Sequence, residues 1–235
     1  MADHGWLLQR SIVLSGTATK PNGTLEARGT TKDWPEAWVA SGPRTDRGRA
    51  SRRRIVDAAC ELFFDRGVVA TGLHEIALAS RTGKGQIYHY FRDKPDLVLA
   101  VVVTQVDRTL AAQQGHLAQM TSADDLRAWA DQAVAAHNHG RPARCPLGAL
   151  VSEVAASDDV LRQALEAGFA RWRSALALGL SRLQQQGCAP ADRDPEELAE
   201  ILLCAYEGGV LMSEVRGDIR PLRLALDAAV ASVLV

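Results

Sequence analysis

Residues 73–91 read LHEIALASRTGKGQIYHYF, two short helical patterns on either side of a break. Thr71 is the expected N-cap of the first helix, and residues 80–83 form the break. The second short helix is expected over residues 84–90, with Ile87 and Phe91 on its buried side. The inward positions of the first helix are Leu73, Ile76 and Ala77.

A longer helix is expected before this stretch, beginning near Ser51 and ending at Gly67, where a left-handed cap is favoured. Its buried face is Ile55, Ala58, Ala59, Leu62 and Phe63. A helix packed across two short helices that are joined by a tight turn forms a helix-turn-helix. The sequence therefore predicts this motif between Ser51 and Phe91.

The last helix of the motif, residues 84–90, carries polar groups on its outer face. Lys84 can donate hydrogen bonds to guanine, and Gln86 can form a bidentate pair with adenine. Gly85 would let the backbone approach closely, and Tyr88 and His89 share the outer face. We therefore predict that this helix enters the major groove of double-stranded DNA.

Charge is divided unevenly along the chain, although the net charge is −1. Residues 44–94 hold eleven Lys and Arg against six Asp and Glu, whereas residues 95–235 hold twelve against eighteen. A basic segment joined to an acidic one suggests that the basic part meets a polyanion. Chance clustering of solvated charge explains the division equally well. Two interpretations are likewise open for the arginines before and at the start of the first helix. They form either an arm that contacts phosphates or the minor groove, or an ordinary run of solvated charges: Arg44, Arg47, Arg49, Arg52, Arg53 and Arg54.

The chain resembles the tetracycline-repressor (TetR) family of bacterial regulators at these residues. The matching runs are IVDAACELF at 55–63, Gly67, Thr71, Ile76-Ala77, GKGQIYHYF at 83–91, Lys94 and Leu97. The resemblance implies that the third helix reads bases, while the groups that match Thr71, Tyr88, His89, Tyr90 and Lys94 hold phosphates or the groove wall. One departure is Arg81, where the family usually has glycine in the turn.

The predicted DNA-contacting residues combine both arguments. His74 lies on the outer face of the second helix and could equally be solvated, and Tyr90 could instead belong to the core. The full set is Arg52, Thr71, His74, Lys84, Gly85, Gln86, Tyr88, His89, Tyr90 and Lys94.

The whole chain is predicted to be all-α, because no alternating β-branched run with hairpin turns occurs. Asp93 is the expected cap of a fourth helix, and later helices are expected over residues 122–138, 147–155, 158–187, 196–215 and 222–234. Three parts are predicted: a mostly disordered leader and basic arm (1–48), the helix-turn-helix domain (49–95) and an effector-binding and dimerisation domain (96–235). The three leader tryptophans leave partial docking open. Because no methionine occurs between Met1 and Met120, a later natural start such as Val39 is also suggested.

Other classes of protein find little support in the 235 residues. The chain is 47% hydrophobic and 23% charged, lacks an apolar run long enough to span a bilayer, and has no signal-peptide pattern, so a cytoplasmic protein is expected. Cys60, Cys145, Cys188 and Cys204 form no C-x-x-C pair and are expected to be buried small hydrophobes.

Catalytic and metal-binding motifs are also lacking. His137 and His139 lie near Cys145, but two residues apart on a helix they point to different sides. Lys84 follows a glycine, yet Leu78 stands where a phosphate-binding loop needs its first glycine. We therefore expect no enzyme activity, no cofactor and no metal.

The C-terminal body is expected to bind a small molecule and form a homodimer, as the resemblance implies. Residues 145–153 and 202–212 resemble one TetR subgroup more loosely. Aromatic and apolar residues beside a few polar ones suggest an effector pocket, although each could simply fill the core: Trp129, His137, Leu150, Phe169, Trp172, Arg173 and Leu176. A stripe of small and apolar residues suggests the dimer interface, with an intrachain helix contact as the alternative: Leu198, Ile201, Leu202, Ala205, Gly208, Gly209 and Met212.

The leading prediction is a repressor released from a palindromic operator by a small hydrophobic effector. A dimer also follows from DNA geometry, because paired recognition helices must reach half-sites about one helical turn apart. The alternative is a small-molecule-binding or enzymatic helical protein whose helix-turn-helix is vestigial.

Overall fold

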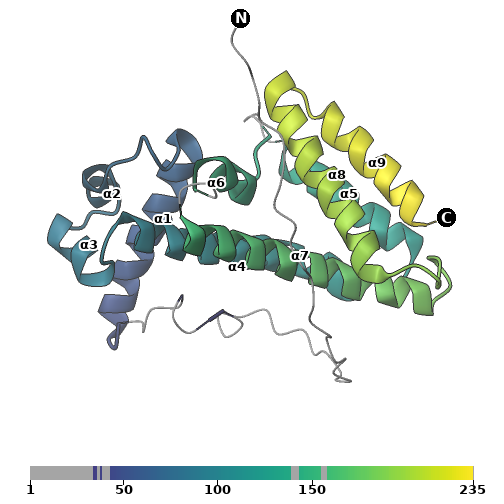
Figure 1. The fold of residues 1–235 in the computed structure, drawn as a ribbon, viewed down its shortest axis with the longest axis horizontal. Coiled ribbons are helices and arrows are strands. Elements are labelled where there is room, and N and C mark those ends of the chain that lie inside the picture. The colour runs from purple at the N-terminus through teal and green to yellow at the C-terminus, as the bar shows by residue number, and fades with distance from the viewer. Residues whose placement is uncertain (1–33, 36–37, 39–42, 139–142, 155–157, 235) are drawn as a thin grey trace, which may run out of the picture.

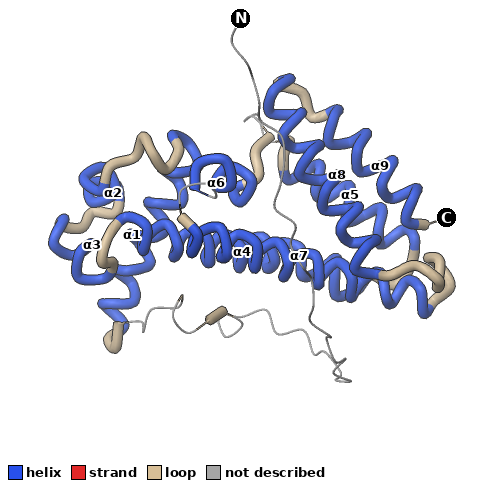
Figure 2. The backbone as a smooth tube through the Cα atoms, in the orientation of Figure 1, coloured by secondary structure: helices blue, strands red, loops and turns tan. Residues whose placement is uncertain are grey.

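The computed structural model describes residues 34–35, 38, 43–138, 143–154 and 158–234, which form nine helices and no strand (Figure 2). The all-α prediction is confirmed for this part of the chain. Three helices gather at one end of the molecule (Figure 1), namely α1 (Asp46–Arg66), α2 (Leu73–Ala79) and α3 (Lys84–Tyr90). Within the described ranges, no helix combines the length and apolar character needed to cross a membrane.

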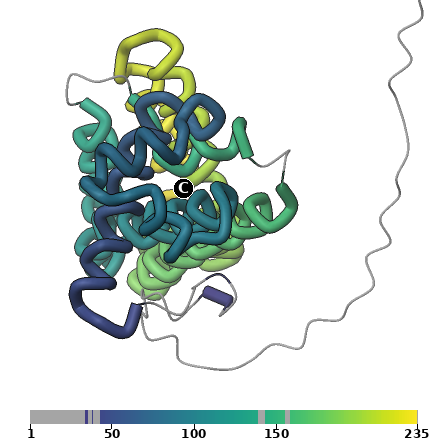
Figure 3. The backbone as a smooth tube through the Cα atoms, turned by 90° about the vertical axis from the view of Figure 1, so that its left-hand side faces the viewer, coloured from purple at the N-terminus to yellow at the C-terminus, as the bar shows by residue number. Residues whose placement is uncertain are grey.

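Six further helices form the body of the molecule. The long helices α4 (Lys94–Gln119) and α7 (Asp159–Gln185) lie side by side, as both the front and the side view show (Figures 1 and 3). The C-terminal pair α8 (Pro195–Arg216) and α9 (Arg220–Val233) packs as a hairpin. The shorter helices are α5 (Ala123–Ala136), which contacts α4 and α9, and α6 (Pro146–Val154), which contacts α1, α4 and α7.

Local sequence explains where most of these helices begin. The side chains of Asp93, Asp158 and Asp194 accept hydrogen bonds from backbone N–H groups in the first turns of α4, α7 and α8. Ser122 and Asp125 form a reciprocal capping box at the start of α5. The predicted cap at Asp93 is confirmed.

The apolar residues form two clusters, and α4 contributes to both. Residues 97–102 of α4 pack with the apolar faces of α1, α2 and α3. Val103, Val106 and Leu117 instead join the cluster formed mainly by α5, α7, α8 and α9. Helix α4 therefore connects the helix-turn-helix directly to the body.

The predicted leader differs from the structure where it can be compared. Helix α1 begins at Asp46 rather than Ser51, because Thr45 caps it by accepting a hydrogen bond from Gly48 N. Trp34 is buried: its indole N–H donates to Asp107 at 3.4 Å, and the Arg171 guanidinium lies 4.8 Å from the centre of its ring. The possible docking of a leader tryptophan is thus observed for Trp34, whereas Trp6 and residues 1–33 lie outside the described residues.

Candidate nucleic-acid interface

A small core fixes the three N-terminal helices relative to one another. Ile55 and Phe63 of α1, Ile76 of α2, Ile87 of α3 and Phe91 after it are each at most 2% exposed. Since Ile87 is the only residue of α3 that is buried, this helix is held by one face. Its other face is left toward solvent at the end of the molecule (Figure 3).

The turn between α2 and α3 is held by hydrogen bonds. The buried Ser80 hydroxyl donates to Ile76 O at 2.7 Å and lies 2.8 Å from the Thr82 hydroxyl, and Thr82 N donates to Ala77 O at 2.9 Å. Arg81 has a φ of 52°, the left-handed region that favours glycine. The departure noted at Arg81 therefore puts a long basic side chain where a glycine would be unstrained, and this side chain is exposed.

The outer face of α3 presents five predicted DNA-contacting residues to solvent: Lys84, Gly85, Gln86, Tyr88 and His89 are all exposed. A Cβ added at Gly85 would meet no atom within 4 Å, so the backbone there is open to a partner. The Lys84 ammonium lies 6.0 Å from the centre of the half-exposed Tyr88 ring. This face contains no carboxylate, and it therefore combines hydrogen-bond donors with positive charge.

Other predicted contact residues surround this face. His74 is exposed on α2, and Lys94 is half-buried in the first turn of α4. Tyr90 is half-buried and packs against the core, its ring 4.9 Å from that of His89. Exposed arginines at the start of α1, Arg47 and Arg53, have no ion-pair partner among the residues that the structure describes.

Two predicted residues are placed differently from expectation. Thr71 is not the N-cap of α2, because Gly72 takes that position, and Thr71 is only 1% exposed. Its hydroxyl donates to Gly67 O at 2.7 Å, so it fixes the turn and presents no donor to a phosphate. Arg52 turns away from the arm toward α4, with its guanidinium 5.0 Å from the centre of the Phe91 ring. Neither side chain belongs to the exposed face around α3.

In the body, the predicted pocket residues separate into several environments. Trp129 and Trp172 are fully buried, and both indole N–H groups donate to the amide oxygen of Gln113, at 2.9 and 3.0 Å. Leu176 is likewise fully buried. Leu150 belongs to the other apolar cluster, beside α1. These four residues fill the interior, and none of them lines the cavity described next.

A cavity of about 400 Å³ lies between α7 and α8, and it includes two of the predicted residues. Phe169 stacks at 6.5 Å on Trp172, and Arg173 forms ion pairs with Glu196 and Glu200 at 2.9 and 3.1 Å. The lining residues are Glu166, Phe169, Ala170, Arg173, Glu200, Leu203, Cys204 and Glu207.

Polar groups that the sequence reasoning missed lie beside this cavity. Burial raises the pKa of the Glu207 carboxyl, although the nearby Cys145 thiol lowers it in part. Burial and the Glu207 charge raise the pKa of Cys145 well above its ordinary value. The hydroxyl of Tyr206, next along α8, lies 2.7 Å from His137 Nε2. In the sequence, Cys145, Tyr206 and Glu207 are marked only by apolar neighbours at helical spacing. That pattern is a weak indication of a polar site.

The cysteines and histidines show no grouping of three or more metal-ligating side chains within the described part of the chain. Cys60 and Cys145 are buried as expected, whereas Cys188 is half-buried and Cys204 is exposed. The expectation of burial is therefore wrong for Cys204. His139 lies outside the described residues.

Comparison with known proteins supports a single assignment. Residues 55–101 match "Bacterial regulatory proteins, tetR family", and residues 122–228 match "Transcriptional regulator LmrA/YxaF-like, C-terminal domain". The chain is 31% identical to the transcriptional regulator AcuR of Cereibacter sphaeroides over 194 residues, which cover 78% of this chain and 87% of that protein. The chain belongs to the TetR family.

Two further relatives agree with this membership. The transcriptional repressor NemR of Escherichia coli is 25% identical over 183 residues, covering 75% of this chain and 90% of NemR. The crystal structure of the regulatory protein TetR from Rhodobacter sphaeroides superposes with a TM-score of 0.69 at 27% identity, covering 78% of this chain and 98% of that one. As a TetR-family member, the chain is a DNA-binding transcriptional regulator with an N-terminal helix-turn-helix and a helical C-terminal domain.

The predicted dimer stripe of this TetR-family chain splits into two faces of α8. Leu198, Leu202 and Gly209 are buried within the chain, and a Cβ added at Gly209 would lie 2.8 Å from Leu222 Cα of α9. At these positions the intrachain alternative is correct. Gly208 and Met212 are exposed, and a Cβ at Gly208 would meet nothing within 4 Å. Ile201 and Ala205 are half-buried.

Proposed function

We propose that this regulator binds a two-fold symmetric operator as a homodimer, inserting α3 of each subunit into the major groove. The observation that carries the proposal is the outer face of α3. Its donors are exposed, it lacks acidic residues, and Ile87 anchors its inner face. Lys84 and Gln86 read bases in this proposal, while Tyr88, His89 and Lys94 hold phosphates or the groove wall.

DNA binding is tested with fragments of the protein's own upstream DNA at several salt concentrations. Gln86→Ala should relax base preference and cost about 1–3 kcal/mol, whereas Lys94→Ala should weaken all sequences alike and reduce the salt slope by about one unit. Gln114→Ala, on the exposed side of α4, is the matched control and should bind as the wild type does.

The alternative, a small-molecule-binding or enzymatic protein with a vestigial helix-turn-helix, predicts no specific binding even at low salt. Wild-type affinity in both the Gln86 and the Lys94 variants would contradict the assignment of α3 as the recognition helix.

The homodimer is proposed to form through the outer faces of α8 and α9. Leu211, Val215 and Leu224 are 59%, 73% and 56% exposed, and Met212 is 45% exposed. Together with the open backbone at Gly208, they form an apolar surface of the kind that marks protein interfaces. An isologous pairing of this surface would place two α3 helices on one operator.

The proposal also includes that the bound regulator represses transcription and that a small effector releases it from DNA. The relative NemR, which is named a transcriptional repressor, supports this part. We place the effector site at the cavity between α7 and α8, where Phe169 and Leu203 offer apolar contacts beside the Glu207 carboxyl. An effector releases DNA only if it prefers the non-binding conformation.

The effector site is tested by measuring operator affinity across a panel of hydrophobic compounds. An active compound should act at lower concentration on the wild type than on Phe169→Ala. Equal potency on both proteins would exclude this cavity.

A further inference from the structure

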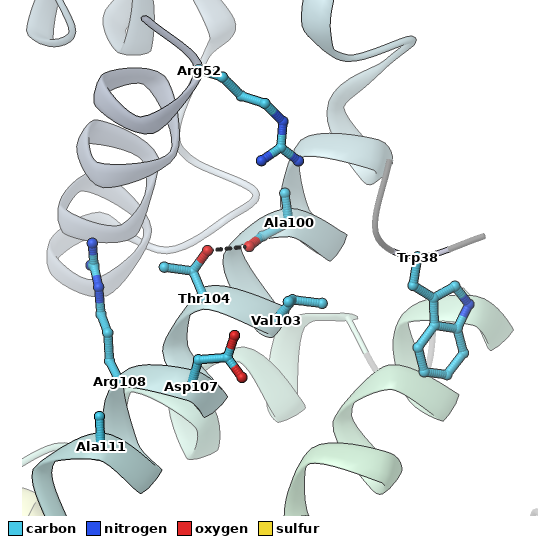
Figure 4. Close-up of a pocket in the computed structure, with 8 residues that line it drawn as sticks. All are labelled: Trp38, Arg52, Ala100, Val103, Thr104, Asp107, Arg108 and Ala111. Carbon is cyan, nitrogen blue, oxygen red and sulfur yellow. Dashed lines mark hydrogen bonds between the residues drawn. The ribbon is translucent and has the colours of Figure 1, made fainter. Parts of the chain in front are cut away.

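A second cavity, of about 310 Å³, lies where the DNA-binding helices meet the body. Figure 4 shows Arg52 extending from α1 toward Ala100 of α4, with Trp38 on the opposite side. The lining residues are Trp38, Arg52, Ala100, Val103, Thr104, Asp107, Arg108 and Ala111. None of them lines the cavity between α7 and α8.

Most polar groups around this second cavity are already bonded to protein. The Asp107 carboxylate accepts from Arg171 at 3.0 Å and from the Trp34 indole at 3.4 Å. Arg108 pairs with Asp57 of α1. The Thr104 hydroxyl donates to Ala100 O at 2.7 Å (Figure 4).

Arg52 is the exception. Its guanidinium has no hydrogen bond or ion pair to any residue in the described ranges, and it lies 5.0 Å from the centre of the Phe91 ring. The Asp96 carboxylate, whose charge raises the pKa of Arg52, is itself paired with Arg92 at 3.4 Å. Burial lowers the pKa of Arg52, so this cation is partly removed from water without a bonded counter-ion.

We propose that this cavity binds a small monocarboxylate with an aromatic or branched apolar body. The carboxylate pairs with the Arg52 guanidinium, whose planar fork fits two carboxylate oxygens. The apolar body lies along Ala100 and Val103 and is covered by Trp38. A volume near the lower end of ligand pockets admits a body about the size of one aromatic ring.

Trp38 is suited to the role of cover because its surroundings hold it in place. Its backbone N–H donates to Pro35 O at 2.8 Å, and its ring lies 5.9 Å from the buried Trp34 ring. Trp38 also packs against both apolar clusters. The cavity walls thus come from α1, from α4 and from Trp38.

The location gives binding a consequence for the regulator. Its walls include the first helix of the DNA-binding motif and the helix that joins this motif to the body. A ligand between them stabilises the present spacing of α1 and α4 and therefore biases the orientation of α3. The binding claim itself is independent of the proposed operator and effector, because it is measured without DNA.

The test uses para-fluorobenzoate as the probe, observed by fluorine NMR on the full chain. The wild type should broaden the probe signal saturably, whereas the neutral analogue para-fluorobenzamide should bind far more weakly. Arg52→Gln should weaken probe binding by about tenfold or more, because a charge-assisted hydrogen-bond pair is lost. Arg66→Gln, the same change at an exposed position of α1, should leave binding unchanged.

A second variant protects the test against misfolding of the first. Trp38 precedes α1, so Trp38→Ala leaves the helix intact and should weaken the probe several-fold by removing the apolar cover. No saturable binding to the wild type up to about 10 mM overturns the proposal. Equal affinity of Arg52→Gln or of the benzamide overturns it as well. Arg52 as a DNA phosphate contact is the competing outcome, in which the probe does not bind and Arg52→Gln lowers the salt slope of operator binding.

Discussion

Replacing Gln113 with leucine should destabilise the body more than any surface change. The Gln113 oxygen accepts from the indole N–H groups of both Trp129 and Trp172, and all three side chains are buried. Leucine is apolar and offers no acceptor. The change therefore leaves two buried donors without partners.

The magnitude follows from the two lost hydrogen bonds. A buried donor left without a partner costs about 1–3 kcal/mol, so two cost about 2–6 kcal/mol. The free energy of unfolding of most domains is only about 5–15 kcal/mol. For a chain of this size, a loss of that order lowers the midpoint of thermal unfolding by roughly 5–20 °C.

The assay is urea unfolding followed by circular dichroism and by tryptophan fluorescence. Gln114→Leu is the matched control, since its side chain is exposed one position further along α4. If Gln113→Leu unfolds within about 0.5 kcal/mol of the wild type, the shared acceptor does not stabilise the fold and the reasoning fails.

Three further predictions concern single positions. Arg81→Gly should raise the free energy of unfolding by up to about 1.6 kcal/mol. Relief of the left-handed backbone gains about 1–2 kcal/mol, and the added freedom of the unfolded chain costs about 0.4–1 kcal/mol. Urea unfolding measures it, and a clear loss of stability would contradict it. Gly208→Leu should leave the monomer folded but shift sedimentation toward monomer, and an undisturbed dimer would show that the interface lies elsewhere. Gly209→Leu should instead cost about 1–3 kcal/mol of stability, because the new side chain clashes with Leu222. Burial raises the pKa of Glu207, so the folded chain holds the carboxyl proton more tightly than the unfolded chain does. The protein therefore loses stability as the pH rises from the ordinary glutamate pKa through the raised one. Glu207→Gln should lose less stability over that pH range in urea unfolding, and parallel pH curves for the two proteins would rule the effect out.

The helix-turn-helix could be predicted closely because its signals are local. The sequence predicts the third helix over residues 84–90, and α3 has the same bounds. The spacing of Ile76 and Ile87 fixed the inward faces without knowledge of the remaining chain. The prediction that Thr71 caps α2 is wrong because a threonine and a glycine in succession both suit an N-cap, and only the contact with Gly67 O decides between them.

The body was harder to predict because packing between distant segments decides each position. Aromatic residues at helical spacing look alike whether they fill a core or line a cavity, and only Gln113 shows that Trp129 and Trp172 share an interior site. Likewise, two adjacent glycines cannot both face one neighbour. Gly209 faces α9, so Gly208 is turned outward. No signal within an arginine run identifies Arg52 as the residue that lies over Phe91.

Because α4 contributes residues to both apolar clusters, a tilt of this helix would move one cluster relative to the other. At 1.5 Å per residue its 26 residues measure about 39 Å. A tilt of about 5° about its C-terminal end would displace its N-terminal end by roughly 3 Å, about the length of one hydrogen bond. Lys94 and the packing of Phe91 lie at the N-terminal end, which such a tilt would displace. A shift in the body too small to disturb its own packing can therefore be large enough to misalign α3 with a base pair.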